Sequence, residues 1–299
     1  MRLVVNSSVK AHIAVLSTNL FFAANYSFIK LISPSFIKPF GLNIYRVGIS
    51  ILLFWIIWLF GKTPAGIRKE DINRFILCGL TGVAINQLFF LKGLTMTSTV
   101  HGSLLMLTTP LLITVFALWV LKEAMTLHKA IGLALGIGGA ALLILSKESS
   151  AQGNNYILGD ILILVNAISY SIYFILVKPL MQHYSPLQVI RWIFTIGFFI
   201  MLPFGWTEAT QVDFSLFGWE EFAAFSAIIF TGTFLAYIFN AYGIRHLGAG
   251  TTGAYIYTQP VFAVIIASLL LGEHITLLKF IAALLIFSGV YIAGMKKKG

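Results

Sequence analysis

Charged side chains are scarce in this sequence, and acidic ones are the scarcest. Only 10% of the 299 residues are charged and just ten are Asp or Glu, whereas 59% are apolar and the mean hydropathy is +0.92. A soluble globular domain carries about 25% charged and roughly 45–50% apolar residues. The shortage of charge therefore excludes a water-soluble protein and indicates an integral membrane protein.

Disulfides, metal-ligand clusters and catalytic motifs are also missing from the sequence. The single cysteine, Cys78, falls within an apolar run, where it has no partner for an internal disulfide and is no metal site alone. We find no HExxH, no GxSxG and no acid–histidine constellation of the kind that an intramembrane enzyme would need. We therefore expect Cys78 to fill the core, and we expect no catalytic residue, no metal and no cofactor.

Long apolar runs make up most of what remains. A helix needs about 20 predominantly apolar residues to cross a hydrocarbon core of roughly 30 Å. The runs are continuous rather than alternating, which excludes an outer-membrane barrel, and the first is followed at once by another, unlike a signal peptide. We predict an all-α integral membrane protein with ten transmembrane helices, at 11–32, 41–60, 73–94, 98–121, 128–146, 158–180, 187–206, 219–243, 250–271 and 276–295.

The distribution of basic residues orients these predicted spans. With the amino terminus in the cytoplasm, fourteen of the twenty Lys and Arg residues fall in cytoplasmic segments and six in outer ones. Because cytoplasmic loops are enriched in Lys and Arg, we predict a protein of the cytoplasmic (inner) membrane with both termini in the cytoplasm. The net charge of +10 is then mostly a topology signal, so the expected partners are membrane lipids and a small solute, and no nucleic acid.

The sequence repeats itself at an offset of 150 positions. "TTPLLITVFALWVLKEAMT" at 108–126 is echoed by "TQPVFAVIIASLLLGEHIT" at 258–276. Three glycines recur at the same offset: Gly82 with Gly232, Gly93 with Gly243 and Gly139 with Gly289. We interpret this pattern as a duplication of 10–147 and 157–298, joined by a polar linker.

Each copy holds five predicted spans. Because five is an odd number, the two copies must have opposite orientations in the membrane. The second copy must enter the membrane from the opposite side, so the halves are inverted and related by a pseudo-two-fold axis in the membrane plane. Secondary transporters of this plan bind their substrate near the midplane, where the repeats meet. Two similar packings, one open to each side, would then provide alternating access.

The residues at the end of each copy resemble a known family. "PLLITVFALWVLKEAMTLHKAIGLALGIGGAALLI" and "PVFAVIIASLLLGEHITLLKFIAALLIFSGVYIAG" each hold a Pro-containing span, then Lys-Glu or Gly-Glu, then Thr, then a last span rich in small residues. This pattern, which covers nearly the whole chain, is similar to the EamA branch of the drug/metabolite transporter superfamily. The resemblance implies ten transmembrane helices, both termini inside, and export of amino acids or other small metabolites. It does not identify the substrate.

Polar and aromatic residues inside the spans form the candidate substrate cavity. Buried amides must be paired, and hydrogen bonding between helices would explain each one singly. Their concentration in the first, third, sixth, eighth and ninth spans favours a shared cavity, and the resemblance points to the same helices. Neutral amides and phenols suit a small zwitterion or a polar aromatic solute. The set is Asn19, Asn25, Tyr26, Asn86, Gln87, His101, Asn166, Tyr170, Tyr173, Tyr237, Asn240, Tyr242, Tyr255, Tyr257 and Gln259.

Two prolines and two arginines occupy repeated positions inside the spans. Pro110 and Pro260 each remove one backbone hydrogen bond, and we expect them to kink the fourth and ninth helices at the cavity, with nearby threonines binding the freed backbone. Arg46 and Arg191 lie one to two turns inside their spans. We expect both to reach headgroups or carbonyls at the interface, the alternative being that one binds a substrate carboxylate.

Two acids, Glu123 and Glu273, each close a span just before a Thr that can start the next helix. We expect each carboxylate to bind the amides at that incoming helix N-terminus, where the helix dipole favours negative charge. The other acids fall in loops or at span ends, and Asp160 lies near the start of the sixth span. Since proton-coupled and sodium-coupled carriers commonly keep an ionisable group within the membrane, we expect uniport or exchange, with coupling through His101 as the lesser alternative.

Small residues in the fifth and tenth spans indicate close helix packing. Gly132 and Gly136 have the small-xxx-small spacing, and Ser288 and Gly289 fall in the tenth span. We expect them to pack helices within the fold, so that a monomer suffices, the alternative being a homodimer. The function that the sequence favours is alternating-access export of amino acids or related solutes. The alternatives are an uptake permease of the same fold and a channel.

Overall fold

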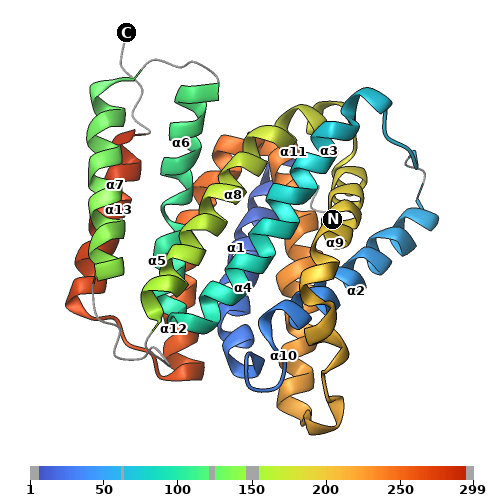
Figure 1. Cartoon of the computed structure of the whole chain (residues 1–299). Helices are drawn as coiled ribbons and strands as arrows, with labels where there is room; N and C mark the ends of the chain where they lie inside the picture. Colours follow the sequence, from blue (N-terminus) through green and yellow to red (C-terminus); the bar gives the residue numbers. More distant parts are fainter. Residues whose placement is uncertain (1–6, 62–63, 121–124, 146–154, 294–299) are drawn as a thin grey trace, which may run out of the picture.

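The computed structural model describes residues 7–61, 64–120, 125–145 and 155–293, and every regular element within them is helical. Figure 1 shows a bundle of long helices, with one helix pair set at its edge. The elements are α1 (Ser7–Ile32), α2 (Pro39–Leu59), η1 (Lys69–Asp71), α3 (Ile72–Gly79), η2 (Leu80–Ile85), α4 (Asn86–Met96), α5 (Thr99–Met106), α6 (Thr109–Val120), α7 (Leu127–Leu145), α8 (Tyr156–His183), α9 (Pro186–Thr210), η3 (Phe214–Leu216), α10 (Trp219–Ile229), η4 (Phe230–Leu235), α11 (Ala236–Ala254), η5 (Tyr255–Thr258), α12 (Gln259–Leu271) and α13 (Leu277–Ala293).

Eight helical segments are long and apolar enough to cross a membrane. They coincide with eight of the predicted spans, and the two shorter apolar helices, α7 and α13, coincide with the remaining two. The all-helical, multi-pass membrane class predicted from composition is therefore confirmed. The eight segments are Ser8–Ile32, Pro39–Leu59, Lys69–Met96, Thr99–Phe116, Tyr156–His183, Pro186–Thr210, Trp219–Gly248 and Thr251–Leu271.

Two of the spans contain a π-helical turn at the same repeated position. In η2, Gly82 meets the ring of Tyr173 from α8, and in η4, Gly232 meets the side chain of Asn25 from α1. A Cβ atom added to Gly82 would lie 2.4 Å from the Tyr173 ring, and one added to Gly232 would lie 2.5 Å from Asn25 Oδ1. A larger residue at either position would therefore force the Tyr173 ring or the Asn25 side chain to shift.

The two repeated prolines begin helices instead of kinking them, which corrects the sequence prediction. A turn at Leu107 separates α5 from α6, and Pro110 lies in the first turn of α6. Pro260 likewise lies in the first turn of α12, directly after the 3₁₀ turn η5. Proline costs little there because the first amides of a helix have no intrahelical partner. Thr108 Oγ1 donates to the Leu105 carbonyl at 2.7 Å, as proposed for the backbone near the break.

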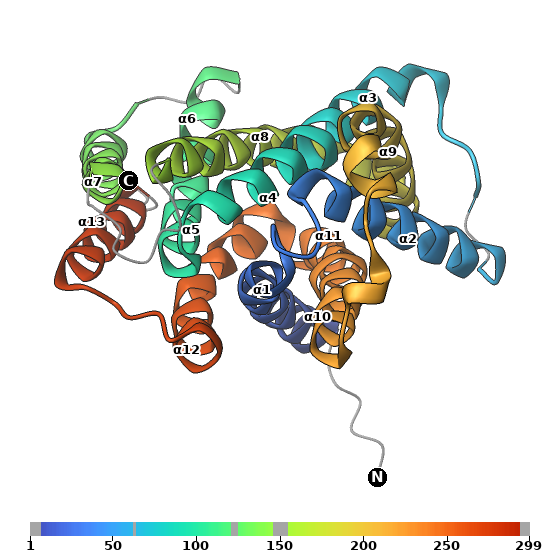
Figure 2. The same cartoon turned by 60° about the horizontal axis from the view of Figure 1, so that its bottom comes forward.

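The first helix of each half packs among helices of the other half. Helix α1 lies against α10, α11 and α12, whereas α8 lies against α3, α4, α5 and α6. Figure 2 shows α1 beside α10 and α11, with α8 on the opposite side of α4. This exchange brings residues that are far apart in the sequence to one central region.

Helices α7 and α13 pack against each other at the edge of the bundle (Figures 1 and 2). A Cβ atom added to Gly289 would lie 2.5 Å from the Gly132 carbonyl oxygen and 2.7 Å from the Gly136 amide nitrogen. The glycines of the small-xxx-small pattern therefore let the two backbones approach within the fold.

Candidate functional site

A cavity lies where α1, α2, α4, α5, α8, α11 and α12 meet. Its empty volume, which includes space open to solvent, is about 440 Å³. It combines amides and phenols with one guanidinium and a few apolar side chains, the mixture expected of a site that orients a small polar solute. The lining residues are Phe22, Asn25, Tyr26, Arg46, Asn86, Gln87, Phe90, Met106, Asn166, Tyr170, Tyr237 and Gln259.

Eight of the fifteen residues predicted for the cavity line it: Asn25, Tyr26, Asn86, Gln87, Asn166, Tyr170, Tyr237 and Gln259. Two further predicted residues hold lining side chains from behind. Asn19 Oδ1 accepts a hydrogen bond from Gln259 Nε2 at 2.8 Å, and Asn240 Nδ2 donates to the Tyr170 hydroxyl at 3.3 Å. One amide and one phenol of the cavity wall are therefore held in place by amides behind them.

The remaining five predicted residues lie away from the cavity wall. Tyr173 stacks on Tyr170 and packs against Gly82. The other four contact different neighbours: His101 with Asp160, Tyr242 with His246, Tyr255 with His12 and Tyr257 with Phe287. These four residues contact other side chains and do not line the cavity.

Arg46 is the one cation among the described residues that line the cavity. Its side chain is only 2% exposed, so it does not reach the interface as expected from sequence. Nε donates to Thr233 Oγ1 at 2.9 Å, and Thr233 Oγ1 donates in turn to the Ile228 carbonyl at 2.9 Å, within the π-helical span. In the described part of the chain no carboxylate forms a salt bridge with Arg46, and its Nη1 has no hydrogen-bond partner. A buried guanidinium in this state is a ready partner for an anionic group on a ligand.

Two acceptors in the cavity wall also lack protein partners. Asn25 Oδ1 and Asn166 Oδ1 are buried without a hydrogen bond, while Asn166 Nδ2 donates to the Asn86 carbonyl at 2.8 Å. Buried polar groups are usually hydrogen-bonded, so each unsatisfied group calls for a partner. The wall thus offers one free cationic donor and two free neutral acceptors.

Arg191 behaves as the sequence predicted, in contrast to Arg46. Its Nη2 donates to the carbonyls of Pro64 and Ala65 at 3.1 and 2.9 Å, and its guanidinium stacks on the rings of Trp55 and Trp58. The side chain is buried under this loop. Its role is therefore to hold the connection between α2 and α3 in place.

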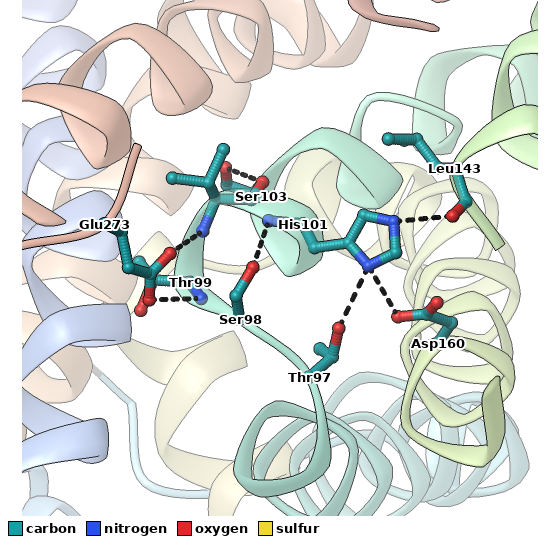
Figure 3. Close-up of polar contacts among 9 residues, drawn as sticks. Thr97, Ser98, Thr99, His101, Ser103, Leu143, Asp160 and Glu273 are labelled. Carbon is teal, nitrogen blue, oxygen red and sulfur yellow. Dashed lines mark hydrogen bonds and ion pairs between the residues drawn. The ribbon is translucent and has the colours of Figure 1, made fainter. Parts of the chain in front are cut away.

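His101 forms a buried pair with Asp160, which corrects the prediction of no acid–histidine constellation. Nδ1 lies 3.2 Å from Asp160 Oδ1, and both side chains are fully buried (Figure 3). The sequence placed Asp160 at the start of a span, where an acid is ordinarily hydrated. The packing of Gly159 against Gly93 instead draws this first part of α8 against α4 and leaves Asp160 without water.

Glu273 binds a helix N-terminus, although not the one predicted. Its carboxylate oxygens accept from the amides of Thr99 and Val100, each at 3.0 Å, so it caps α5 instead of the following α13 (Figure 3). The prediction considered only neighbours in the sequence, and the end of α12 packs on the start of α5. Glu123 lies outside the described residues.

Sequence reasoning missed the apolar part of the cavity. Phe22, Phe90 and Met106 line it, but in a chain with 59% apolar residues an aromatic or methionine carries no signal of its own. Arg46 was the detectable exception, because an arginine one to two turns inside a span is rare.

Comparisons with known proteins agree with this architecture. The profile of the EamA-like transporter family matches the chain twice, at residues 9–145 and 157–295. The uncharacterized transporter YetK of Bacillus subtilis (strain 168) is 26% identical over 253 residues, which cover 83% of this chain and 76% of YetK. The resemblance seen in the sequence is therefore confirmed.

Two further comparisons concern function and fold. A probable terminal-alkyne amino-acid exporter of Streptantibioticus cattleyicolor is 24% identical over 265 residues, which cover 87% of this chain and 85% of the exporter. A crystal structure of a protein that is 16% identical matches with a TM-score of 0.62 and covers 96% of both chains. At that identity the structural match shows a shared fold alone.

Proposed function

This chain belongs to the EamA-like transporter family, and on that premise we propose that it exports small zwitterionic solutes, amino acids above all, by alternating access. In this proposal ten helices form two inverted five-helix repeats in the cytoplasmic membrane, with both termini in the cytoplasm. A monomer is sufficient. The single observation that carries the substrate class is the buried Arg46 in the cavity wall, whose Nη1 has no partner among the described residues.

The contacts between equivalent positions support the inverted repeat. Gln87 and Tyr237 are 150 positions apart in the sequence, and Gln87 Nε2 donates to the Tyr237 hydroxyl at the cavity. Positions with the same role in two repeats meet each other only near a two-fold axis. The contacts of Gly289 with Gly132 and Gly136 have the same self-symmetric character, because Gly139, its counterpart, meets Ala282 and Ile286.

The chemistry of the cavity supports a zwitterion. The Arg46 guanidinium suits a carboxylate, and the free Asn25 and Asn166 oxygens suit the N–H groups of an ammonium. A dianion would find a single cation in the wall, and a simple amine would leave that cation unpaired. The name of the Streptantibioticus relative, an amino-acid exporter, also supports this class and the direction of transport.

Counterflow in proteoliposomes tests the proposal. Vesicles loaded with an unlabelled amino acid should take up the same labelled amino acid faster than empty vesicles, as expected of a carrier and not of a channel. The corresponding amino-acid amides, which lack the carboxylate, should compete poorly. A screen of the twenty amino acids in which none gives counterflow, while amines or neutral metabolites do, would overturn the assignment.

Arg46→Gln should reduce counterflow at least ten-fold, because a charge-assisted hydrogen bond contributes about 1.5–3 kcal/mol and a factor of ten corresponds to about 1.4 kcal/mol. The matched control is Lys38→Gln, which also removes one positive charge but changes an exposed residue before α2. Unchanged counterflow in Arg46→Gln would contradict the role of this arginine.

A further inference from the structure

The His101–Asp160 pair lies outside the cavity, and the hydrogen-bond partners of His101 show which of its nitrogens carries a proton. His101 Nε2 lies 2.8 Å from the Leu143 carbonyl oxygen, which only accepts hydrogen bonds, so Nε2 carries a proton. Nδ1 faces Asp160 Oδ1 at 3.2 Å and Thr97 Oγ1 at 3.1 Å (Figure 3). Nδ1 and Asp160 Oδ1 therefore face each other directly across this contact.

A second proton must lie between the imidazole and the carboxylate. Without it, the lone pair of Nδ1 would face an ionised carboxylate in a place where neither group contacts water, because both side chains have 0% exposure. Within the described segments of the chain, Asp160 Oδ1 and Oδ2 have no hydrogen-bond partner apart from this contact. Whether the pair is imidazolium with carboxylate or imidazole with carboxylic acid, the closed contact therefore holds one proton that a deprotonated pair lacks.

Other charged groups near this end of α5 do not replace that proton. Among the elements packed against α5, Glu273 after α12 is engaged with two amides of α5. Helix α1 contributes the half-buried Lys30 and the phenol Tyr26, α4 the exposed Lys92, and α13 the buried Lys279. The ion pair recorded for the His101 imidazole is with Asp160 of α8.

The pair joins the helices that also build the cavity. His101 and the cavity residue Met106 are both on α5, and Asp160 and the cavity residues Asn166 and Tyr170 are all on α8. The bond of Nε2 to Leu143 adds the end of α7 to the same junction. Separation of α5 from α8 would break the pair and hydrate both groups.

We propose that His101 and Asp160 form a proton-binding latch that closes the outer end of the transporter. The closed latch holds one proton that the opened, hydrated and deprotonated pair lacks, so opening is coupled to the release of a proton. A rise of external pH therefore favours the open latch, and a fall favours the closed one. This inference rests on the alternating-access function proposed above, which assigns this end to the outside.

Thiol labelling tests the latch without any substrate. Val100 is fully buried beside Glu273, so Val100→Cys, in a Cys78→Ala background, should be protected from a membrane-impermeant maleimide while the latch is closed. Adding Asp160→Asn removes the carboxylate that shares the second proton and keeps a side chain that can donate to neutral Nδ1. The rate of thiol labelling should increase with pH when the native pair is intact. This increase should be at least about five-fold larger than in the protein with Asp160→Asn, because only the intact pair releases a proton on opening. The protein with Asp160→Asn also corrects for the thiol's own ionisation.

Transport gives the second readout. With the internal pH fixed, counterflow by the unmodified protein should increase severalfold between external pH of about 6 and about 8. Asp160→Asn should not show this increase, because its closed site holds no second proton to release. His183→Gln, which changes an exposed histidine, should keep the normal profile. Parallel pH profiles of labelling with and without Asp160→Asn would overturn the latch, whereas absence of counterflow at every pH in the unmodified protein would overturn the proposed function and leave the labelling result to decide on the latch.

Discussion

The two ends of the molecule carry different polar contacts at related positions. Asp160 is the fifth residue of α8, and His12 is the sixth residue of α1, the corresponding first helix of the other half. At one end Asp160 meets His101 with both side chains fully buried. At the other end His12 Nδ1 lies 2.7 Å from the Tyr255 hydroxyl, in a contact that is only partly buried.

A duplicated scaffold does not require duplicated chemistry. The π-helical turns, the glycines and the helix breaks recur in both halves, because backbone geometry must be repeated for the halves to fit together. The contacts at the ends are free to differ, and this difference gives one end a buried proton site and the other an ordinary hydrogen bond. We expect substitutions at the two ends to change stability by different amounts. Equivalent substitutions in the repeated scaffold of the two halves should change it by similar amounts.

The largest effect is expected when the buried pair is broken. His101→Leu should lower the free energy of unfolding by about 3–5 kcal/mol, because it leaves Asp160 buried without a partner. The double variant His101→Leu/Asp160→Leu should recover a large part of that loss, since no uncompensated charge remains. His12→Leu should cost about 1 kcal/mol, the value of an ordinary hydrogen bond. Unfolding in detergent measures all three, and equal losses at the two ends would remove the distinction between them.

An intermediate and equal effect is expected at the two π-helical turns. Gly82→Ala and Gly232→Ala should each cost about 1–3 kcal/mol, the usual range for overpacking, because the new methyl group would overlap Tyr173 or Asn25. Gly66, whose Cβ would meet nothing within 4 Å, gives a matched Gly→Ala control. Thermal stability of the three variants compares the halves, and a loss confined to one of them would show that the repeat is not structurally equivalent.

The smallest effect is expected from the cap of α5. Glu273→Gln keeps one amide acceptor and removes the negative charge from the helix N-terminus, so a loss of about 0.5–2 kcal/mol is expected. Glu220→Gln at the exposed start of α10 is the control for charge removal. Measurement of unfolding at low and high salt separates the charge from the packing. An effect as large as that of His101→Leu would mean that Glu273, and not the pair, holds this end together.

Much of the fold could be predicted from residue type and spacing. The apolar runs gave the positions of the helices, and the recurrence of "TTPLL" as "TQPVF" gave the family resemblance. The site was only partly accessible, because the depth of Asn25 or Gln87 within a span says nothing about which neighbouring helix it faces. Arg46 and Arg191 make the point, since they occupy corresponding positions and yet one enters the cavity while the other holds a loop.

Hydropathy and local backbone chemistry depend on residues close together in the chain, and they were enough to predict the membrane environment, the helical content and the family of this protein. Only the three-dimensional packing shows which polar side chains share a cavity, that Glu273 caps α5, and that His101 and Asp160 share a buried contact. These features depend on the packing of α1 and α8 into opposite halves. That packing sets side chains far apart in the sequence against one another, and only their burial together gives a carboxylate or a guanidinium its chemical role.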